Sequence, residues 1–298
     1  MRPLKILLIC AHPGDAFDDS GGTLCHHVER GDQVTVVLVT TGVRSHAALF
    51  MDEKNKPIGQ RVEKLAQATS EEIRNFKAEE VRRAGAELGI TDIRLLFEED
   101  DILLVNPPII RKISHLIRQE KPDLLITHHP MAEGGLLGTH PQIGQIVLLA
   151  LESCSRWLRD EDLPPHQVSQ VFFIGGGIEK RWSISKTMNI VYDVYVDVTD
   201  TIERKVRALD HLKSQRYDGV YARKRMETAD GHFGEVMEIP YAEVFIRHVP
   251  DVYYYLPLEE RSLSQGKGWT DRMNRVSKIV APYVPMPESP PQTPGSTR

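Results

Sequence analysis

Short apolar runs of strand length alternate along this chain with longer stretches of helical periodicity. Such alternation predicts a mostly parallel sheet with helices on both faces, because parallel neighbours are joined by a crossover connection that is usually a helix. We therefore expect a Rossmann-like α/β domain. The expected strands are 5–11, 33–40, 93–96, 124–127, 168–174 and 190–196, and the expected helices are 22–29, 70–88, 107–119, 142–156 and 201–215.

Three regions depart from this alternation. Phe50–Thr69 is polar and long for a strand-to-helix connection, which indicates an insertion or a lid near the site. The pattern is less regular beyond Gly219. We accordingly expect the main domain over residues 1–218, a small C-terminal extension packed on it over 219–281, and a disordered tail rich in Pro, Ser and Thr over 282–298.

Composition excludes several classes of function. The net charge of −5 over 298 residues argues against nucleic acid or an anionic membrane as a partner. The apolar runs are too short for a transmembrane helix, and three scattered cysteines do not form a disulfide framework. We expect a reduced, cytoplasmic protein that acts on a small molecule; a homo-oligomer is compatible with this composition.

Residues suited to bind a metal follow two of the expected strands. The first strand ends in Ala11–Asp15 (Ala-His-Pro-Gly-Asp), and Gly21–Thr23 (Gly-Gly-Thr) opens the next helix. Open α/β sheets place their sites at the carboxyl ends of strands, and a His with a carboxylate suits zinc or another divalent ion. The strand at 124–127 is followed by His128, His129 and His140. Each histidine alone reads equally as a loop residue or a helix cap, but the joint pattern at two strand ends favours a metal site.

This pattern resembles the PIG-L/LmbE-like family of zinc-dependent N-deacetylases. The first motif of that family reads Ala-His-Pro-Asp-Asp-Glu and is followed by Gly-Gly-Thr, at the spacing of Ala11–Ala16 and Gly21–Thr23 here. Weaker similarity extends over most of residues 4–250. The resemblance implies a Zn²⁺-dependent hydrolase whose partner is a small N-acylated substrate, most often an N-acetylated sugar or sugar conjugate.

The resemblance also implies a ligand set. His12 and Asp15 match the first two zinc ligands, and His140 matches the third because Gly144 follows it by four residues, as in the family. A competing register places His140 on the first His of the family's His-Pro-Asp-His motif and leaves Ile143 at the ligand position. We prefer the first register because an isoleucine cannot bind a metal.

Two further residues are predicted to bind substrate. Arg44 follows the second strand and is expected at the same sheet edge, where it would hold a hydroxyl, phosphate or carboxylate group. The resemblance implies that Asp100, after the third strand, contacts substrate hydroxyls. The alternatives are a surface arginine and a solvated acidic turn.

Gly14 is the main departure from the family, because that position holds the Asp that acts as general base. Loss of a general base typically costs about 10²–10⁴-fold in rate. In the preferred register Leu137 also replaces the first His of the second motif. The alternatives are therefore a hydrolytically impaired metal- or sugar-binding relative, or a hydrolase of another amide or ester. Asp18 and Asp19 read equally as acids favoured by a helix N-terminus. The candidate replacements for the base are Asp18, Asp19, His129 and Glu133.

Overall fold

The computed structural model describes residues 2–100, 103, 105–131, 138–157, 159, 163–174, 191–263 and 269–279. Glu133, Leu137 and the tail expected at 282–298 lie outside the described residues. No helix in the described ranges combines the length and the hydropathy that crossing a bilayer requires. Each of the three cysteines is buried with a free thiol.

The described strands form one seven-stranded sheet in the order β3-β2-β1-β4-β5-β7-β6. The first five in that order are parallel, whereas β7 runs antiparallel to both of its neighbours. This confirms the expected α/β fold. The strands are β1 (Lys5–Cys10), β2 (Gln33–Thr40), β3 (Asp92–Glu98), β4 (Leu124–His128), β5 (Gln170–Ile174), β6 (Val194–Asp197) and β7 (Ala242–Arg247).

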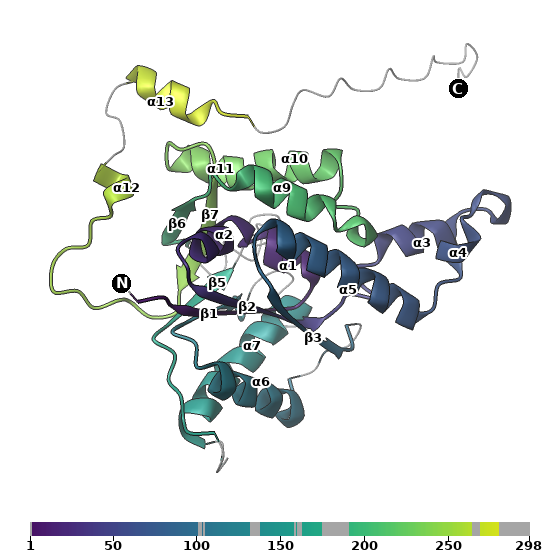
Figure 1. Cartoon of the computed structure of the whole chain (residues 1–298), viewed down its shortest axis with the longest axis horizontal. Coiled ribbons are helices and arrows are strands. Elements are labelled where there is room, and N and C mark those ends of the chain that lie inside the picture. Colours follow the sequence, from purple (N-terminus) through teal and green to yellow (C-terminus); the bar gives the residue numbers. More distant parts are fainter. Residues whose placement is uncertain are drawn as a thin grey trace.

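Helices cover both faces of the sheet (Figure 1). Successive side chains of β1 point alternately into two cores, and all of them from Ile6 to Cys10 are buried. This explains why β1 reads as a continuous apolar run. One core lies under α1 (Pro13–Asp18), α2 (Gly21–Glu29), α5 (Ser70–Glu87) and α9 (Ile202–Asp210), and the other under α6 (Pro107–Glu120) and α7 (Thr139–Glu152).

The order of the strands creates a switch point. The chain passes from β1 to β2 and β3 on one side and then returns to place β4 on the other side of β1. Connections from the carboxyl ends of β1 and β4 therefore diverge to opposite faces, which leaves a crevice where open α/β sheets hold their ligands.

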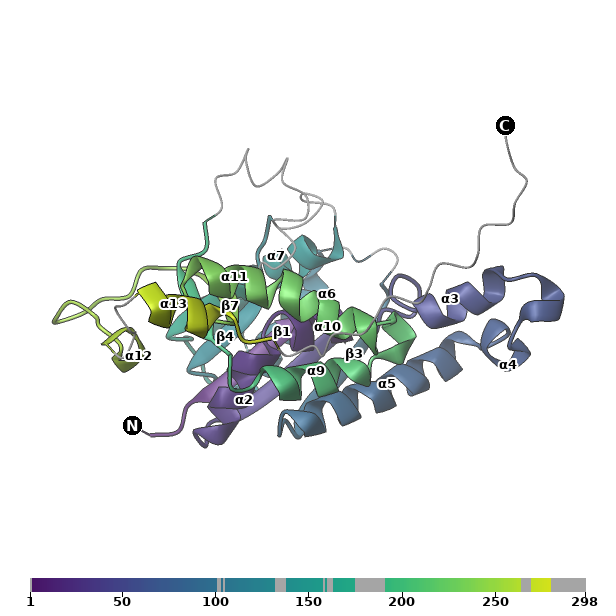
Figure 2. The ribbon, with the colours of Figure 1, turned by 90° about the horizontal axis from the view of Figure 1, so that it is seen from above.

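The expected insertion at 50–69 forms short helices that project from the body beside the N-terminal end of α5 (Figure 1, Figure 2). They are α3 (Ala48–Asn55), the 3₁₀ turn η1 (Ile58–Gln60) and α4 (Glu63–Ala66). Phe50 is buried edge-on against Phe76 of α5, with ring centroids 5.4 Å apart, which fastens this part to the body. Its role as a lid stays a prediction.

The part beyond Gly219 is tied into the main sheet. β7 lies between β5 and β6, and α10 (Val220–Thr228) contributes Ala222 and Met226 to the core under α9. The boundary expected at residue 218 stays a prediction. The remaining elements are η3 (Ser153–Trp157), η5 (Lys213–Gln215), α11 (Asp230–Val236), α12 (Glu260–Leu263) and α13 (Trp269–Val276).

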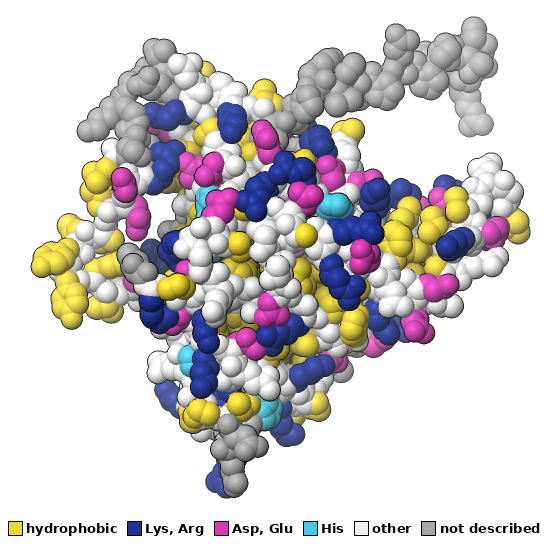
Figure 3. Space-filling model, in the orientation of Figure 1, with side chains coloured by type: hydrophobic (Ala, Val, Ile, Leu, Met, Phe, Trp, Pro, Cys, Tyr) yellow, Lys and Arg dark blue, Asp and Glu magenta, His cyan; other side chains and the backbone are white. Residues whose placement is uncertain are grey.

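The surface carries interspersed positive and negative side chains on the face seen in Figure 3. Hydrophobic side chains gather where the segment between β7 and α12 protrudes. Exposed apolar runs of this kind favour burial against another surface, and the expected homo-oligomer stays a prediction. The most exposed members are Val252, Tyr254, Tyr255, Leu256 and Leu258.

Gly144 allows α7 to approach the end of β4. A Cβ at this position would lie 2.4 Å from the carbonyl oxygen of His128 and 2.9 Å from the backbone of Pro130. We predict that Gly144→Ala lowers the free energy of unfolding by about 1–3 kcal/mol, the usual cost of overpacking. Denaturant unfolding would measure it, with Gly59→Ala as control because nothing lies within 4 Å of a Cβ there. A Gly144→Ala midpoint at or above that of the unmodified chain would contradict this prediction.

Candidate metal centre

His12 and Asp15 lie where β1 ends and α1 begins. Pro13 occupies the first turn of α1, where its fixed φ favours helix initiation. Because the helix starts at once, the Asp15 carboxylate folds back and accepts the backbone N–H of His12, with N and Oδ2 2.7 Å apart. The same Oδ2 lies 3.3 Å from Nδ1 of the His12 ring.

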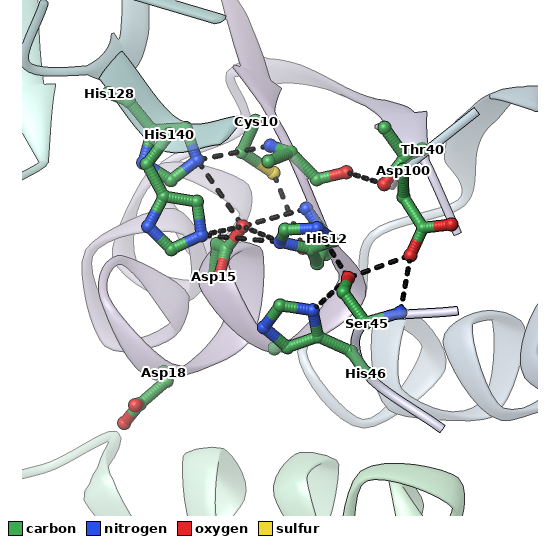
Figure 4. A network of polar contacts seen from close by, with 12 residues as sticks. Cys10, His12, Asp15, Asp18, Thr40, Ser45, His46, Asp100, His128 and His140 are labelled. Carbon is green, nitrogen blue, oxygen red and sulfur yellow. Dashed lines mark hydrogen bonds and ion pairs between the residues drawn. The ribbon is translucent and has the colours of Figure 1, made fainter. Parts of the chain in front are cut away.

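His140 reaches this pair from the first turn of α7. Its Nε2 lies 3.2 Å from Nδ1 of His12 and 3.4 Å from Oδ2 of Asp15. The helix begins at Thr139, three residues earlier than its apolar periodicity predicts, so the imidazole is held by regular structure. The structure thus brings the three predicted ligands together at the carboxyl ends of β1 and β4 (Figure 4).

The donor atoms of these three residues fit a zinc ion. Tetrahedral donors about 2.0–2.1 Å from zinc lie about 3.3–3.4 Å from one another. The separations here are 3.2, 3.3 and 3.4 Å. Two imidazole nitrogens and one carboxylate oxygen also form a donor set that zinc accepts, with a fourth position left for water or substrate.

Two more histidines border the predicted set. The sequence named His128 among the histidines that follow the strand at 124–127 but assigned neither it nor His46 as a ligand. His128, the last residue of β4, lies with Nε2 3.3 Å from Oδ2 of Asp15, and its ring stacks on His140 with centroids 4.3 Å apart. The ring of His46 stacks on His12 at 3.8 Å. Donor atoms of two further trios lie within 4.8 Å of one another: His12, His46 and His140, and Asp15, His128 and His140.

The hydrogen bonds of His128 make it a weaker ligand candidate. The backbone N–H of Ala11 donates to its Nε2 at 3.0 Å, which occupies the lone pair facing Asp15. A backbone nitrogen is always the donor, so Nε2 carries no proton and no free pair in this arrangement. The position of His128 at a strand end was the only signal in the sequence for its presence here.

Electrostatics prepare the cluster for a cation. Burial alone would raise the pKa of Asp15, but the charge of His140 and the hydrogen bond and charge of His12 outweigh it and hold that pKa well below the ordinary value. Burial, followed by the charge of His140, lowers the pKa of His128 to about 4. Burial and the charge of His12 lower the pKa of His46 to about 3. These pKa shifts favour an ionised Asp15 beside uncharged His128 and His46 rings. Metal ligands must likewise be deprotonated before they bind.

The three predicted catalytic residues contact side chains other than the predicted ligands. Asp18 is buried and points away from the imidazoles (Figure 4), with Oδ2 2.6 Å from Nε of Arg225. Asp19 lies 3.9 Å from the same guanidinium. His129 rests edge-on against Phe173, with ring centroids 5.2 Å apart. The structure therefore directs the Asp18 carboxylate away from the predicted ligands, and the catalytic roles of Asp19 and His129 stay predictions.

The two predicted substrate residues differ in exposure. The side chain of Arg44 is 57% exposed and lies 3.3 Å from the Glu99 carboxylate. Asp100 is 5% exposed and accepts the backbone N–H groups of Arg44 and Ser45 and the hydroxyl of Ser45. Burial would raise the pKa of Asp100, but these hydrogen bonds, with those from Ser45 strongest, hold it below the ordinary value.

Other side chains occupy the space beside Gly14. Its N–H donates to Oε1 of Gln215 at 3.1 Å, and a Cβ would lie 3.0 Å from Nε2 of Gln215 and 3.3 Å from the Tyr217 ring. The 3₁₀ turn η5, which carries Gln215, is anchored because the Glu80 carboxylate accepts both the N–H and the hydroxyl of Ser214. An amide and a phenol ring therefore stand where a side chain at position 14 would project.

Comparisons with known proteins find similarity in sequence and in fold. The chain is 28% identical over 152 residues to a 1D-myo-inositol 2-acetamido-2-deoxy-alpha-D-glucopyranoside deacetylase of Catenulispora acidiphila, a match that covers 45% of this chain and about half (46%) of that relative. The fold is similar to that of the N,N'-diacetylchitobiose deacetylase of Pyrococcus horikoshii, with a TM-score of 0.65, 19% identity, and 82% and 83% of the two chains covered.

A hydratase shares the fold as well. The 4-carboxy-2-hydroxymuconate hydratase of Pseudomonas putida superimposes with a TM-score of 0.64 at 17% identity, over 85% of this chain and 100% of that chain. The fold alone therefore does not fix the reaction. Residues 7–151, which include every predicted metal ligand, match the family described as PIG-L, GlcNAc-PI de-N-acetylase. This region of the chain, which carries the candidate metal centre, belongs to the PIG-L/LmbE-like family.

Proposed function

We propose that the chain is a metal-dependent N-deacetylase that hydrolyses the N-acetyl amide of a small sugar or sugar conjugate. The proposed ligands of Zn²⁺, or of another divalent ion, are His12, Asp15 and His140. The observation that carries the proposal is the mutual spacing of 3.2–3.4 Å among their three donor atoms. The name of the Catenulispora acidiphila relative, a deacetylase of an acetamido sugar, supports the substrate class.

A divalent ion held there would supply Lewis-acid chemistry towards an amide carbonyl. The chain's own residues would do the rest. Asp15 would offset part of the charge of the cation, and by accepting the N–H of His12 it fixes the start of α1. The exposed guanidinium of Arg44 is proposed to hold a polar group of the substrate at the rim of the site.

The predicted general bases differ in the contacts that they would have to give up. Asp18 would have to leave its buried ion pair with Arg225, which is costly because it strands a charge. Of the predicted bases among the described residues, we therefore favour Asp19 and His129. Removing each in turn should identify the base as the residue whose loss abolishes turnover while the metal stays bound.

A second candidate is a hydrolytically impaired relative that binds metal or sugar, or a hydrolase of another amide or ester. The observation that favours it is Gln215, whose amide borders the position where the family carries a carboxylate. Amide groups do not accept a proton at neutral pH, so Gln215 cannot substitute for the base.

The ligand assignment predicts the effect of removing His140. We expect His140→Ala to lose its bound zinc on dialysis, because only two of the three proposed donors would remain to hold the ion. His26→Ala is the matched control, since that imidazole lies on α2 and pairs with Asp200. Elemental analysis gives the stoichiometry. A full equivalent of zinc retained by His140→Ala would refute the assignment.

The proposed activity predicts amine release from simple N-acetyl sugars. We expect the zinc-loaded chain to form a primary amine and acetate in equal amounts from N-acetylglucosamine or diacetylchitobiose, and His140→Ala to form neither. An amine-reactive fluorophore measures the product. If the loaded chain binds these sugars without turnover, and is inactive on other amides and esters too, the binding role replaces the hydrolase proposal.

Gly14 offers the sharpest test of the missing base. We expect Gly14→Asp to raise turnover by at most about 10²–10⁴-fold, the contribution of a general base. Because Gln215 crowds this position, Gly14→Asp combined with Gln215→Ala should gain more than Gly14→Asp alone. Gly14→Asn is the control of equal size that cannot accept a proton. Equal rates for the Asp and Asn variants, in either background, would count against a vacant base position.

A further inference from the structure

The hydroxyl of Ser45 lies at the centre of three polar contacts beside the predicted metal ligands (Figure 4). Its Oγ is 2.7 Å from Oδ2 of Asp100, 2.6 Å from Nδ1 of His46 and 3.4 Å from Nε2 of His12. A serine hydroxyl has one proton to donate and two lone pairs that accept. These three neighbours therefore match its full hydrogen-bonding capacity.

The direction of the hydrogen bonds follows from Asp100. An ionised carboxylate can only accept, and this one already receives the backbone N–H groups of Arg44 and Ser45. The Ser45 proton must therefore point to Asp100, which leaves only lone pairs towards the two imidazoles. Each imidazole nitrogen that faces Ser45 must then carry a proton.

This requirement selects one tautomer of His12. A neutral imidazole has one N–H, so a proton on Nε2 leaves the lone pair on Nδ1. Nδ1 is the atom that lies 3.2 Å from Nε2 of His140 and 3.3 Å from Oδ2 of Asp15. We propose that Asp100 is a positioning residue that acts through Ser45 to present the Nδ1 lone pair of His12 to the metal. The inference rests on the metal-binding role proposed above for His12.

The loop that carries Ser45 is fixed from two sides. Gly42 adopts a φ of +65°, and a Cβ there would lie 2.7 Å from the Cβ of His46, so glycine suits this turn. The ammonium group of Lys77, a fully buried side chain of α5, donates to the backbone oxygen of His46 at 2.7 Å. The backbone N–H of His46 also donates to the carbonyl oxygen of Gly42 at 3.0 Å, so the backbone on both sides of Ser45 is fixed without the imidazole rings.

The same geometry gives Asp100 a role other than the substrate contact that the resemblance implies. Its side chain is buried, and its contacts organise the loop after β2 and orient a predicted ligand. Loss of groups that orient metal ligands typically lowers metal affinity by about 10–100-fold. That is the effect expected for Ser45→Ala and Asp100→Asn.

The hydrogen-bonded series from Asp100 through Ser45 to His12, here called the relay, is tested with matched variants. Their zinc affinity is measured by competition with a chromogenic chelator. Ser45→Ala and Asp100→Asn should bind zinc about 10–100-fold more weakly, whereas Ser45→Thr, which keeps the hydroxyl, should restore most of the affinity. Glu99→Gln is the control, because this neighbouring carboxylate faces the exposed side chain of Arg44. Wild-type affinity in both Ser45→Ala and Asp100→Asn would overturn the inference.

The tautomer itself can be observed without metal and without any variant. Long-range ¹H–¹⁵N spectra of the metal-free chain at neutral pH should show His12 protonated on Nε2 and His46 protonated on Nδ1. His12 protonated on Nδ1 would overturn the inference even if the variants failed to fold. If the tautomer and the zinc affinities are as predicted but the zinc-loaded chain has no deacetylase activity, only the proposed function is refuted. Amine release with unchanged zinc affinity in Ser45→Ala and Asp100→Asn would refute the relay alone.

Discussion

The Asp15 carboxylate organises the end of the sheet on which the site depends. One of its oxygens lies within 3.4 Å of ring nitrogens from His12, His128 and His140 and accepts the backbone N–H of His12. A largely buried carboxylate is costly unless positive charge and hydrogen bonds surround it. The same contacts fix where α1 begins and draw the first turn of α7 to the end of β1. The carboxylate thus gathers imidazoles from three segments around one position.

The placement of the metal donors and the surroundings of Gly14 depend on different parts of the structure. The switch point between β1 and β4 positions the metal donors, whereas Gly14 is covered by η5, which Glu80 of α5 anchors through Ser214. A change at position 14 could therefore be accommodated without moving the donors. This separation explains how the chain can keep a metal site while lacking the family's base at position 14.

The sequence predicted the parallel half of the fold well. Strands buried on both faces, such as β1 and β2, appear as unbroken apolar runs, and their predicted bounds differ from the observed ones by at most one residue. β7 was missed because the charged Glu243 interrupts its short apolar run; this carboxylate is buried in an ion pair with Lys205. The six-residue α1 was also missed, since it is too short to show an apolar period. The start of α7 was placed too late because Thr139–Pro141 reads as a loop.

The residues of the site also differ in whether local sequence could predict their positions. A local motif gave His12 and Asp15, and the spacing to Gly144 gave His140. The proximity of Ser45 to His12 and of Gln215 to Gly14 depends on how loops fold, which no local pattern encodes. Asp18 shows the converse case, since its closeness in sequence suggested a catalytic base, whereas in the structure its carboxylate pairs with Arg225. Sequence separation does not report the direction in which a side chain points.

Diffraction from crystals of the zinc-loaded chain, recorded on both sides of the zinc absorption edge, tests the central claim most directly. The account predicts a single anomalous peak about 2.0–2.2 Å from Nδ1 of His12, Oδ2 of Asp15 and Nε2 of His140. A peak held instead by Asp15, His128 and His140, or by His12, His46 and His140, would contradict the proposed ligand set. No peak among these residues would contradict the metal-dependent function itself.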